Sequence, residues 1–240
     1  METFLKDCSL FNALEIGTGI GNFTEVLVQN AKNIEKITSI DLRILVKDEL
    51  KQKLKDKNVV FLEMDGGSLD FKDNTFDTVC LSNTLHEIEN LDAFFKEVKR
   101  VLKPNGKLIL NEMVRDNLSD RQKSHMYIHH LAAYMDTIRK TRYHGETFTK
   151  KEMFDILKKY NFINESYKEY QTHEMQLKDS DLNEENKYLE QVYKSFYKRI
   201  EEIEDLDIKK KCIDEIKRVS ELTKGKGFFL ATSYICKFGL

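Results

Sequence analysis

The chain has 240 residues, of which 40% are hydrophobic and 33% charged, a composition typical of a folded protein with a sizeable core. Its net charge of −2 argues against a general attraction to a nucleic-acid backbone. No run approaches the ~20 apolar residues of a membrane span, and the first residues do not form a secretory signal, so we expect a cytoplasmic protein. The four cysteines are widely spaced and indicate neither a zinc ribbon nor a disulfide framework.

The first half of the chain alternates short β-branched runs with helical runs, the pattern of a parallel sheet covered on both faces. The predicted strands are residues 12–16, 36–40, 59–64, 78–81 and 107–111, and the predicted helices are residues 23–31, 45–54 and 91–102. Pro104 follows the last of these helices, and Asn105-Gly106 supplies a tight turn before the fifth strand. The pattern predicts the first five strands of a doubly wound α/β fold.

The second half is richer in helical patterns. The expected elements are one or two helices at residues 125–143, a helix opened by the capping-box residues Thr149 and Glu152, strands at residues 163–172 and 228–236, and two helices between those strands. The last two helices predict a helical insertion over residues 181–223. Since no linker long enough to separate domains is evident, we expect a single domain over residues 1–240.

Three glycines follow the first predicted strand within five residues, at Gly17, Gly19 and Gly21. Glycine suits such a turn because it tolerates positive φ and lets a ligand approach the backbone. A dinucleotide-binding turn would place a glycine where Asn22 stands, and a phosphate-binding loop would continue with Lys and Ser or Thr. The turn therefore predicts a ligand site of neither of these classes.

The segment from Leu14 to Gly21 resembles the first motif of the class I S-adenosylmethionine-dependent methyltransferases. Further segments match that family in order: Asp41 ends the second strand, Asp65-Gly66 ends the third, and residues 94–108 resemble the signature before the fifth. The resemblance covers residues 12–112. It implies a Rossmann-like, doubly wound, seven-stranded sheet whose seventh strand is antiparallel, and it implies S-adenosylmethionine as the cofactor.

The resemblance also implies roles for residues at the ends of the strands. A carboxylate at Asp41 is expected to accept both ribose hydroxyls, and Asp65 is expected to meet the adenine amine. Glu15 either positions the glycine turn near the cofactor's amino group or caps nearby backbone. The expected cofactor-binding residues are Glu15, Gly17, Thr18, Gly19, Gly21, Asp41, Leu42, Asp65, Gly66, Ser82 and Asn83.

The candidate catalytic residues are His86, His130 and Tyr134, whose side chains can exchange protons or orient an acceptor. His86 lies in a segment similar to the His-containing segment of methyltransferases of ubiquinone and menaquinone biosynthesis; an exposed helical turn is the alternative. His130 and Tyr134 lie within residues 113–148. We expect that segment to cover the substrate, because only about eleven residues precede the first strand; simple helix packing is the alternative.

Four of the six histidines, His125, His129, His130 and His144, fall within 20 residues of one another. His125 and His129 are four residues apart and share a helix face, as zinc ligands sometimes do. No cysteine or further motif completes such a site, so we expect no metal, while leaving open whether the cluster binds one.

Methyl transfer to an O, N or C atom of a small-molecule acceptor is the function that the resemblance implies. Methylation of a macromolecule, tRNA or protein, is one alternative, although the net charge disfavours nucleic acid. Binding of S-adenosylmethionine without catalysis is another. The helical insertion either pairs two copies into a homodimer or only packs on the sheet.

Overall fold

The computed structural model describes residues 1–170 and 182–240, which divide into two compact units. The first unit contains Met1–Glu112, Lys151–Tyr170 and Tyr234–Leu240, and the second contains Met113–Lys150 and the described part of Gln171–Ser233. The second unit thus contains the described residues of the predicted substrate cover, 113–148, and of the predicted helical insertion, 181–223. Whether the units form the single domain expected over residues 1–240 stays a prediction.

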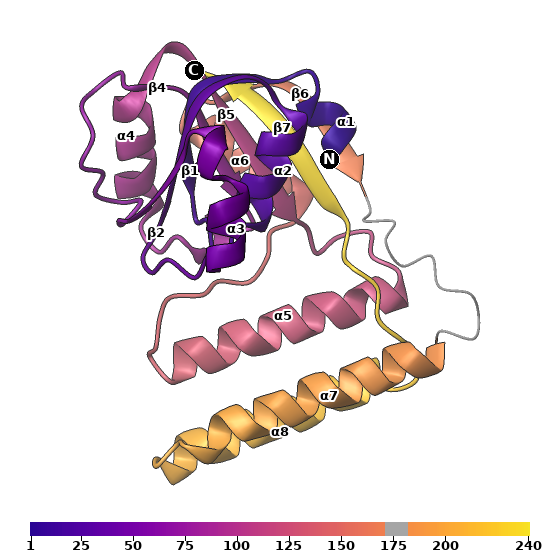
Figure 1. Cartoon of the computed structure of the whole chain (residues 1–240). Coiled ribbons are helices and arrows are strands. Elements are labelled where there is room, and N and C mark those ends of the chain that lie inside the picture. Colours follow the sequence, from indigo (N-terminus) through magenta and orange to yellow (C-terminus); the bar gives the residue numbers. More distant parts are fainter. Residues whose placement is uncertain (171–181) are drawn as a thin grey trace. The chain divides into compact units, whose positions relative to one another are not determined.

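A seven-stranded sheet in the order β3-β2-β1-β4-β5-β7-β6 forms the first unit (Figure 1). Its strands are β1 (Ser9–Ile16), β2 (Lys32–Asp41), β3 (Val59–Glu63), β4 (Phe76–Ser82), β5 (Leu102–Met113), β6 (Ile163–Tyr170) and β7 (Ser233–Gly239). The pairs β1/β2, β1/β4, β2/β3 and β4/β5 are parallel, and β7 is antiparallel. The predicted Rossmann-like fold class is confirmed.

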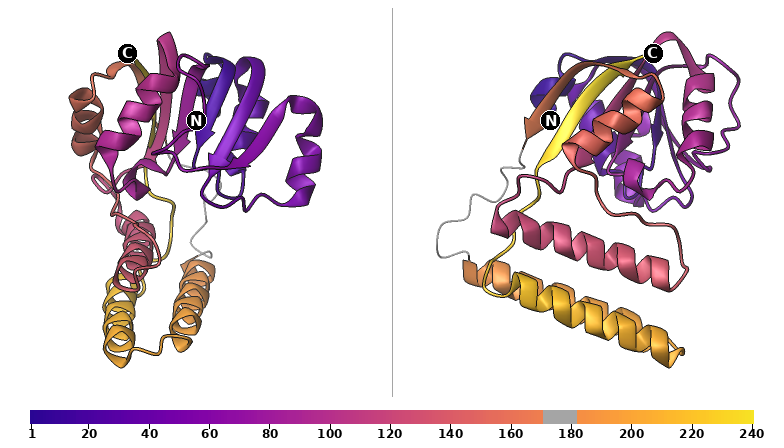
Figure 2. Two further views of the ribbon diagram at one scale, coloured as in Figure 1. Left: turned by 90° about the vertical axis from the view of Figure 1, so that its left-hand side faces the viewer. Right: turned by 180° about the vertical axis from the view of Figure 1, so that it is seen from behind.

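The chain changes its direction of travel across the sheet at β1, with β2 and β3 on one side and β4 and β5 on the other. Helices α2 (Asn22–Asn30) and α3 (Asp48–Lys53) cover one face, and α4 (Leu91–Val101) and α6 (Lys150–Lys159) cover the other (Figure 2). Right-handed crossovers in opposite directions require this division. Such a switch point opens a crevice beyond the carboxyl ends of the central strands, where ligands of doubly wound sheets bind.

Apolar side chains on the sheet and its helices form the core of the first unit. One cluster joins α1 (Glu2–Leu5) and α2 to the sheet, and its buried members are Leu5, Cys8, Leu10, Ala13, Phe23, Leu27, Ile37, Cys80, Ile109 and Ile235. On α4 the spacing of Phe94, Phe95, Val98 and Val101 places all four on one buried face. The Asn90 side chain caps that helix by accepting a 3.0 Å hydrogen bond from the backbone of its third residue.

The fifth strand begins earlier than the sequence predicts. Leu102 already pairs with Phe76, and the register then shifts before the regular ladder starts at Lys107. The expected strand, residues 107–111, is therefore the regular inner part of a longer one. Asn105 takes a positive φ of +65° within the irregular part, which explains the turn signal there.

The seventh strand begins later than expected, at Ser233 instead of residue 228. The backbone N–H groups of Phe229 and Ala231 donate to groups of α5 (Asp120–Ile138), in the second unit. Backbone donors that are bound to a helix are not available to a β-ladder. Residues 228–232 therefore belong to the helical unit, although their apolar pattern resembles that of a strand.

The second unit is built on α5, α7 (Leu182–Glu201) and α8 (Leu206–Thr223), and α8 packs against both of the others. The His- and Tyr-rich stretch expected over residues 125–143 forms one helix, which begins at Asp120 with a capping box of Ser119 and Gln122 and ends at Ile138, so residues 139–143 lie beyond it. The helices share a core of Leu131, Met135, Leu189, Tyr193, Phe196, Ile200, Cys212, Ile216, Val219 and Phe228. No helix in the described residues has both the length and the apolar character needed to cross a membrane.

Candidate cofactor and active site

The glycine turn leaves the carboxyl end of β1 at the switch point of the sheet. Gly17, Gly19 and Gly21 have φ values of +81°, +52° and +92°, and the backbone N–H of Gly17 donates to the Ile40 carbonyl at 2.9 Å. A Cβ at Gly17 would lie 2.2 Å from Oγ1 of Thr84, whereas a Cβ at Gly19 would meet none of the described atoms within 4 Å. The turn is therefore tightly packed at Gly17 and open at Gly19, where a ligand can approach the backbone.

Asp41 ends β2 beside this turn. Its Oδ2 atom accepts a 2.8 Å hydrogen bond from the backbone N–H of Gly19, and its side chain is partly exposed. The following residue, Leu42, is 74% exposed. The structure thus brings two of the predicted cofactor elements, the open part of the turn and the strand-end acid, into direct contact.

Glu15 is the buried acid of the site. Its Oε2 atom accepts hydrogen bonds from Thr24 at 2.5 Å and Ser39 at 2.6 Å, and the Thr24 hydroxyl lies 3.0 Å from that of Thr18. Burial raises the pKa of Glu15, while the bonds from Ser39 and Thr24 oppose that rise. Its other oxygen, Oε1, is buried and has no hydrogen-bond partner among the described residues. A buried acceptor in this state fits a bound polar group such as an amine or a water.

The chain after β4 is held by the neighbouring strand. Asn83 has a φ of +47°, and its N–H donates to the Asn111 carbonyl at 2.8 Å. The Asn111 side chain in turn donates to Oγ of Ser82 at 2.8 Å. Ser82 and Asn83, both expected near the cofactor, therefore lie at the carboxyl end of β4, and β5 determines their conformation.

Glu112 at the end of β5 is a site residue that sequence reasoning missed. Its Oε1 atom accepts from the backbone N–H groups of Thr84 and Leu85 at 2.8 and 2.6 Å, and its Oε2 atom lies 2.9 Å from Nδ1 of His86. Both Glu112 and His86 are buried. Because an ionised carboxylate only accepts, this contact places a proton on Nδ1 of His86. The signal in the sequence was an acid that ends an apolar strand.

Asp65 and Gly66 follow β3. Asp65 is exposed, and its Oδ1 atom accepts a 2.8 Å hydrogen bond from the Gly67 backbone, which closes a local turn. Gly66 is buried, and a Cβ there would lie 2.8 Å from a methyl carbon of Ile16 at the end of β1. The structure brings the ends of β1 and β3 together, and the adenine contact of Asp65 stays a prediction.

His130 and Tyr134, the other candidate catalytic residues, belong to α5. Nε2 of His130 accepts a 3.2 Å hydrogen bond from the Thr147 backbone and lies 3.0 Å from the Thr147 hydroxyl. Tyr134 is 37% exposed, and burial together with neighbouring groups of α8 raises its pKa. These contacts are compatible with helix packing as well as with substrate handling, and the catalytic assignment of both residues stays a prediction.

His125 already has a structural role within the second unit. Its Nδ1 atom accepts a 3.0 Å hydrogen bond from the Ala231 backbone, and burial lowers its pKa to about 4. This contact occupies one of its two possible ligand nitrogens. The structure therefore gives no support to the pairing of His125 with His129 that the i,i+4 spacing suggested.

A doubly wound α/β unit whose switch point carries a glycine turn and strand-end acids belongs to the Rossmann-like cofactor-binding proteins. Residues 14–110 match the family model described as a methyltransferase domain. A sterol 4-C-methyltransferase of Caenorhabditis elegans is 30% identical over 126 residues, which are 50% of this chain and 37% of that protein. A ubiquinone/menaquinone biosynthesis C-methyltransferase of Shewanella pealeana is 29% identical over 103 residues, which are 41% of each chain.

The solved YcgJ protein of Bacillus subtilis is similar in fold, with a TM-score of 0.59 and 16% identity over 100% of this chain and 95% of that one. Residues 14–110, less than half of the chain, therefore resemble the methyltransferase domain of the class I S-adenosylmethionine-dependent methyltransferases. Its matches with the two curated relatives span about two fifths of their lengths. S-Adenosylmethionine fits the open turn at Gly19, the adjacent Asp41 carboxylate and the oxygen of Glu15 that has no partner among the described residues.

Proposed function

We propose that this protein transfers a methyl group from S-adenosylmethionine to a small-molecule acceptor. The observation that carries the proposal is the arrangement at the switch point, where Gly19 leaves its backbone open, Asp41 lies 2.8 Å from it, and Glu15 keeps a buried oxygen without a described partner. The match of residues 14–110 to the methyltransferase domain supports the same reading.

Asp41 would accept the ribose hydroxyls, and Glu15 would lie toward the amino group, with the remaining strand-end residues around them. The other proposed contacts are Gly17, Thr18, Gly21, Leu42, Asp65, Gly66, Ser82 and Asn83. S-Adenosylmethionine, when bound, supplies a methyl group already activated by a sulfonium. The protein's part is then chiefly to position the acceptor and to keep water out.

His86 is the proposed proton acceptor for a hydroxyl or carbon acid. The Glu112 carboxylate, 2.9 Å from Nδ1, holds the imidazole in the tautomer whose Nε2 atom is basic. Glu112 also binds the backbone of Thr84 and Leu85, so it fixes the segment that carries His86. Glu112 is therefore proposed as a positioning residue, and His86 as the residue that takes the proton.

Two measurements test the proposed function. Calorimetry should show binding of S-adenosylmethionine and of its demethylated product; a folded protein that binds neither would contradict the cofactor assignment. Labelled S-adenosylmethionine and fractionated cell extract should then give label in the small-molecule fraction. Label in the RNA or protein fraction would favour a macromolecular acceptor, and binding without label in any fraction would favour a cofactor-binding protein without catalysis.

A further inference from the structure

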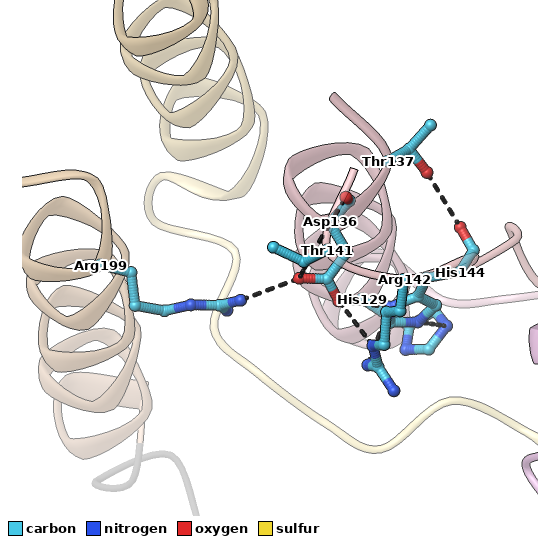
Figure 3. A network of polar contacts seen from close by, with 7 residues as sticks. All are labelled: His129, Asp136, Thr137, Thr141, Arg142, His144 and Arg199. Atoms are coloured by element: carbon cyan, nitrogen blue, oxygen red, sulfur yellow. Dashed lines mark hydrogen bonds and ion pairs between the residues drawn. The ribbon is translucent and has the colours of Figure 1, made fainter. Parts of the chain in front are cut away.

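We propose that His129 and His144, both in the second unit, are two ligands of a divalent transition-metal ion such as zinc. His129 lies on α5, and His144 lies in the segment between α5 and α6. Their Nε2 atoms are 3.4 Å apart, and their rings are inclined at 74° to each other (Figure 3). His144 is buried and His129 partly so.

The separation of the two nitrogens is the one that a shared metal ion requires. Zinc binds histidine nitrogen at about 2.0–2.1 Å with tetrahedral geometry, which places two such nitrogens about 3.3–3.4 Å apart. The observed separation of the two Nε2 atoms, 3.4 Å, lies within that range. Imidazole pairs are ligands that zinc, nickel, cobalt and copper accept, whereas calcium and magnesium prefer oxygen.

A buried carboxylate lies behind His144 and orients it. Oδ2 of Asp136 is 3.0 Å from Nδ1 of His144, and the Asp136 carboxylate also accepts from Arg142 at 2.9 Å and Arg199 at 3.1 Å (Figure 3). Arg142 and Arg199 both donate to the Asp136 carboxylate, which therefore acts as an acceptor, and in its contact with His144 the donor is Nδ1. The lone pair of neutral His144 is then on Nε2, on the side of His129. A histidine whose other nitrogen donates to a carboxylate is the usual arrangement of a metal ligand.

The competing interpretation is a plain hydrogen bond, in which Nε2 of His129 donates to Nε2 of His144. It needs the same tautomer of His144 and accounts for the distance equally well. The Nη2 atom of Arg142 also lies 3.1 Å from Nδ1 of His144, slightly farther than the Asp136 carboxylate at 3.0 Å. A guanidinium nitrogen only donates, so a hydrogen bond from Arg142 would need the other tautomer of His144, and its positive charge would weaken the attraction of a cation. A metal titration separates the two interpretations, because a hydrogen bond needs no ion.

The test uses the full chain, stripped of metal with a chelator and titrated with Zn²⁺ by calorimetry and with Co²⁺ by visible absorption. We expect one ion per chain and a Co²⁺ spectrum with nitrogen ligation. His129→Gln and His144→Gln should each weaken Zn²⁺ binding by more than ~100-fold, and Asp136→Asn, which keeps the shape of the side chain, by ~10- to 100-fold.

His130→Gln is the matched control, because His130 is adjacent on α5 and its Nε2 atom is bound to Thr147. That variant should keep the Zn²⁺ affinity of the wild type within about twofold. Circular dichroism and thermal melting without metal show whether each variant is folded, and zinc should raise the melting temperature of the wild type and not that of His144→Gln. The proposal is overturned if the wild type binds no zinc, or if the folded His129 and His144 variants bind it as tightly as the wild type.

Discussion

Two acids at neighbouring strand ends, Glu15 and Asp41, differ in environment and therefore in role. Glu15 is buried, and its pKa is raised because the protein removes water from it, whereas Asp41 is partly exposed and bonded to the glycine turn. A partly exposed acid can exchange its solvent for ligand hydroxyls at little desolvation penalty. Under the proposed function, we therefore expect Asp41 to contribute more to cofactor affinity than Glu15.

Asp41→Ala should weaken S-adenosylmethionine binding by roughly 1–3 kcal/mol, because two ribose hydroxyls lose a charged acceptor. Asp41→Asn should lose less, since its amide oxygen can still accept from the Gly19 backbone. Calorimetry on both variants measures the difference. Dissociation constants equal to that of the wild type would show that the ribose lies elsewhere.

His125 makes stability depend on pH. Its pKa is about 4 in the folded protein against an ordinary value of 6.5, because burial disfavours the charged form. As the pH falls, the unfolded chain binds this proton at a higher pH than the folded protein does. The free energy of unfolding is therefore unaffected by His125 above about pH 6.5, and it decreases as the pH drops toward about 4, by at most ~3 kcal/mol. Urea unfolding of the wild type and His125→Gln between about pH 7 and pH 5 checks this, and the variant should show the smaller pH dependence.

At the scale of elements, the glycine turn works as a unit with the segment after β4. Thr84 occupies the space beside Gly17, and its hydroxyl donates to the Ser82 carbonyl at 2.9 Å. The glycine turn and the segment after β4 therefore pack directly against each other. Gly19 has no such neighbour among the described atoms, so packing does not explain why this position is a glycine.

Gly17→Ala should mainly lower the stability of the protein, whereas Gly19→Ala should mainly weaken cofactor binding. Gly17→Ala combines a positive φ with a clash against Thr84 and should destabilise the protein by about 3 kcal/mol. Gly19→Ala should destabilise the protein by only about 1 kcal/mol, the cost of a positive φ at alanine. Its methyl group would, however, lie where the proposed cofactor approaches the backbone. Thermal unfolding and calorimetry together measure this crossed pattern. Equal cofactor affinity in Gly19→Ala and the wild type would argue that the ligand does not contact that backbone.

The β4–β5 connection offers a second test at this scale. His86→Gln should lower kcat by roughly 10²- to 10⁴-fold if a proton must leave the acceptor, with cofactor affinity nearly unchanged. Glu112→Gln keeps one acceptor oxygen but no charge, and it should lower kcat less and shift the pH profile of kcat. A matched control is Glu87→Gln, at the partly exposed next residue. Full activity in His86→Gln would leave His86 with a structural role.

At the scale of the whole molecule, the chain forms two units with separate cores. Cys80 lies in the core of the first unit and Cys212 in that of the second, and both are fully buried. Each core is formed by its own elements, which is the condition for local unfolding in separate cooperative steps. The cysteines are natural reporters of those steps.

Thiol labelling in rising urea should expose the two reporters independently. Ile216→Ala removes a fully buried side chain of the second core and should destabilise that unit by about 2–5 kcal/mol, so that Cys212 is labelled at lower urea while Cys80 is unchanged. Ile37→Ala, in the first core, is the matched control and should do the reverse. Mass spectrometry of labelled peptides distinguishes the cysteines. If both reporters shift together in both variants, the units unfold as one.

The alternation of strands and helices, the glycine turn and the strand-end acids could be predicted from the sequence, because each depends on residues close together in the chain. Periodicity and backbone preference act over a few residues and leave a pattern that the sequence displays. The same argument predicted the helices of residues 181–223. It failed at residues 228–232, whose apolar pattern suits a strand but whose backbone donors are taken by α5.

The three hydrogen bonds of Glu112 and the contact of His129 with His144 and Asp136 depended on the tertiary structure alone. Glu112 meets Thr84 from 28 residues away, and His144 meets His129 across a turn whose course no local preference determines. Such contacts arise only when packing brings distant segments together, and the sequence shows their members merely as an acid after a strand and one histidine among several. Residue type and spacing therefore determined the fold class of this protein, while packing decided which polar groups face each other.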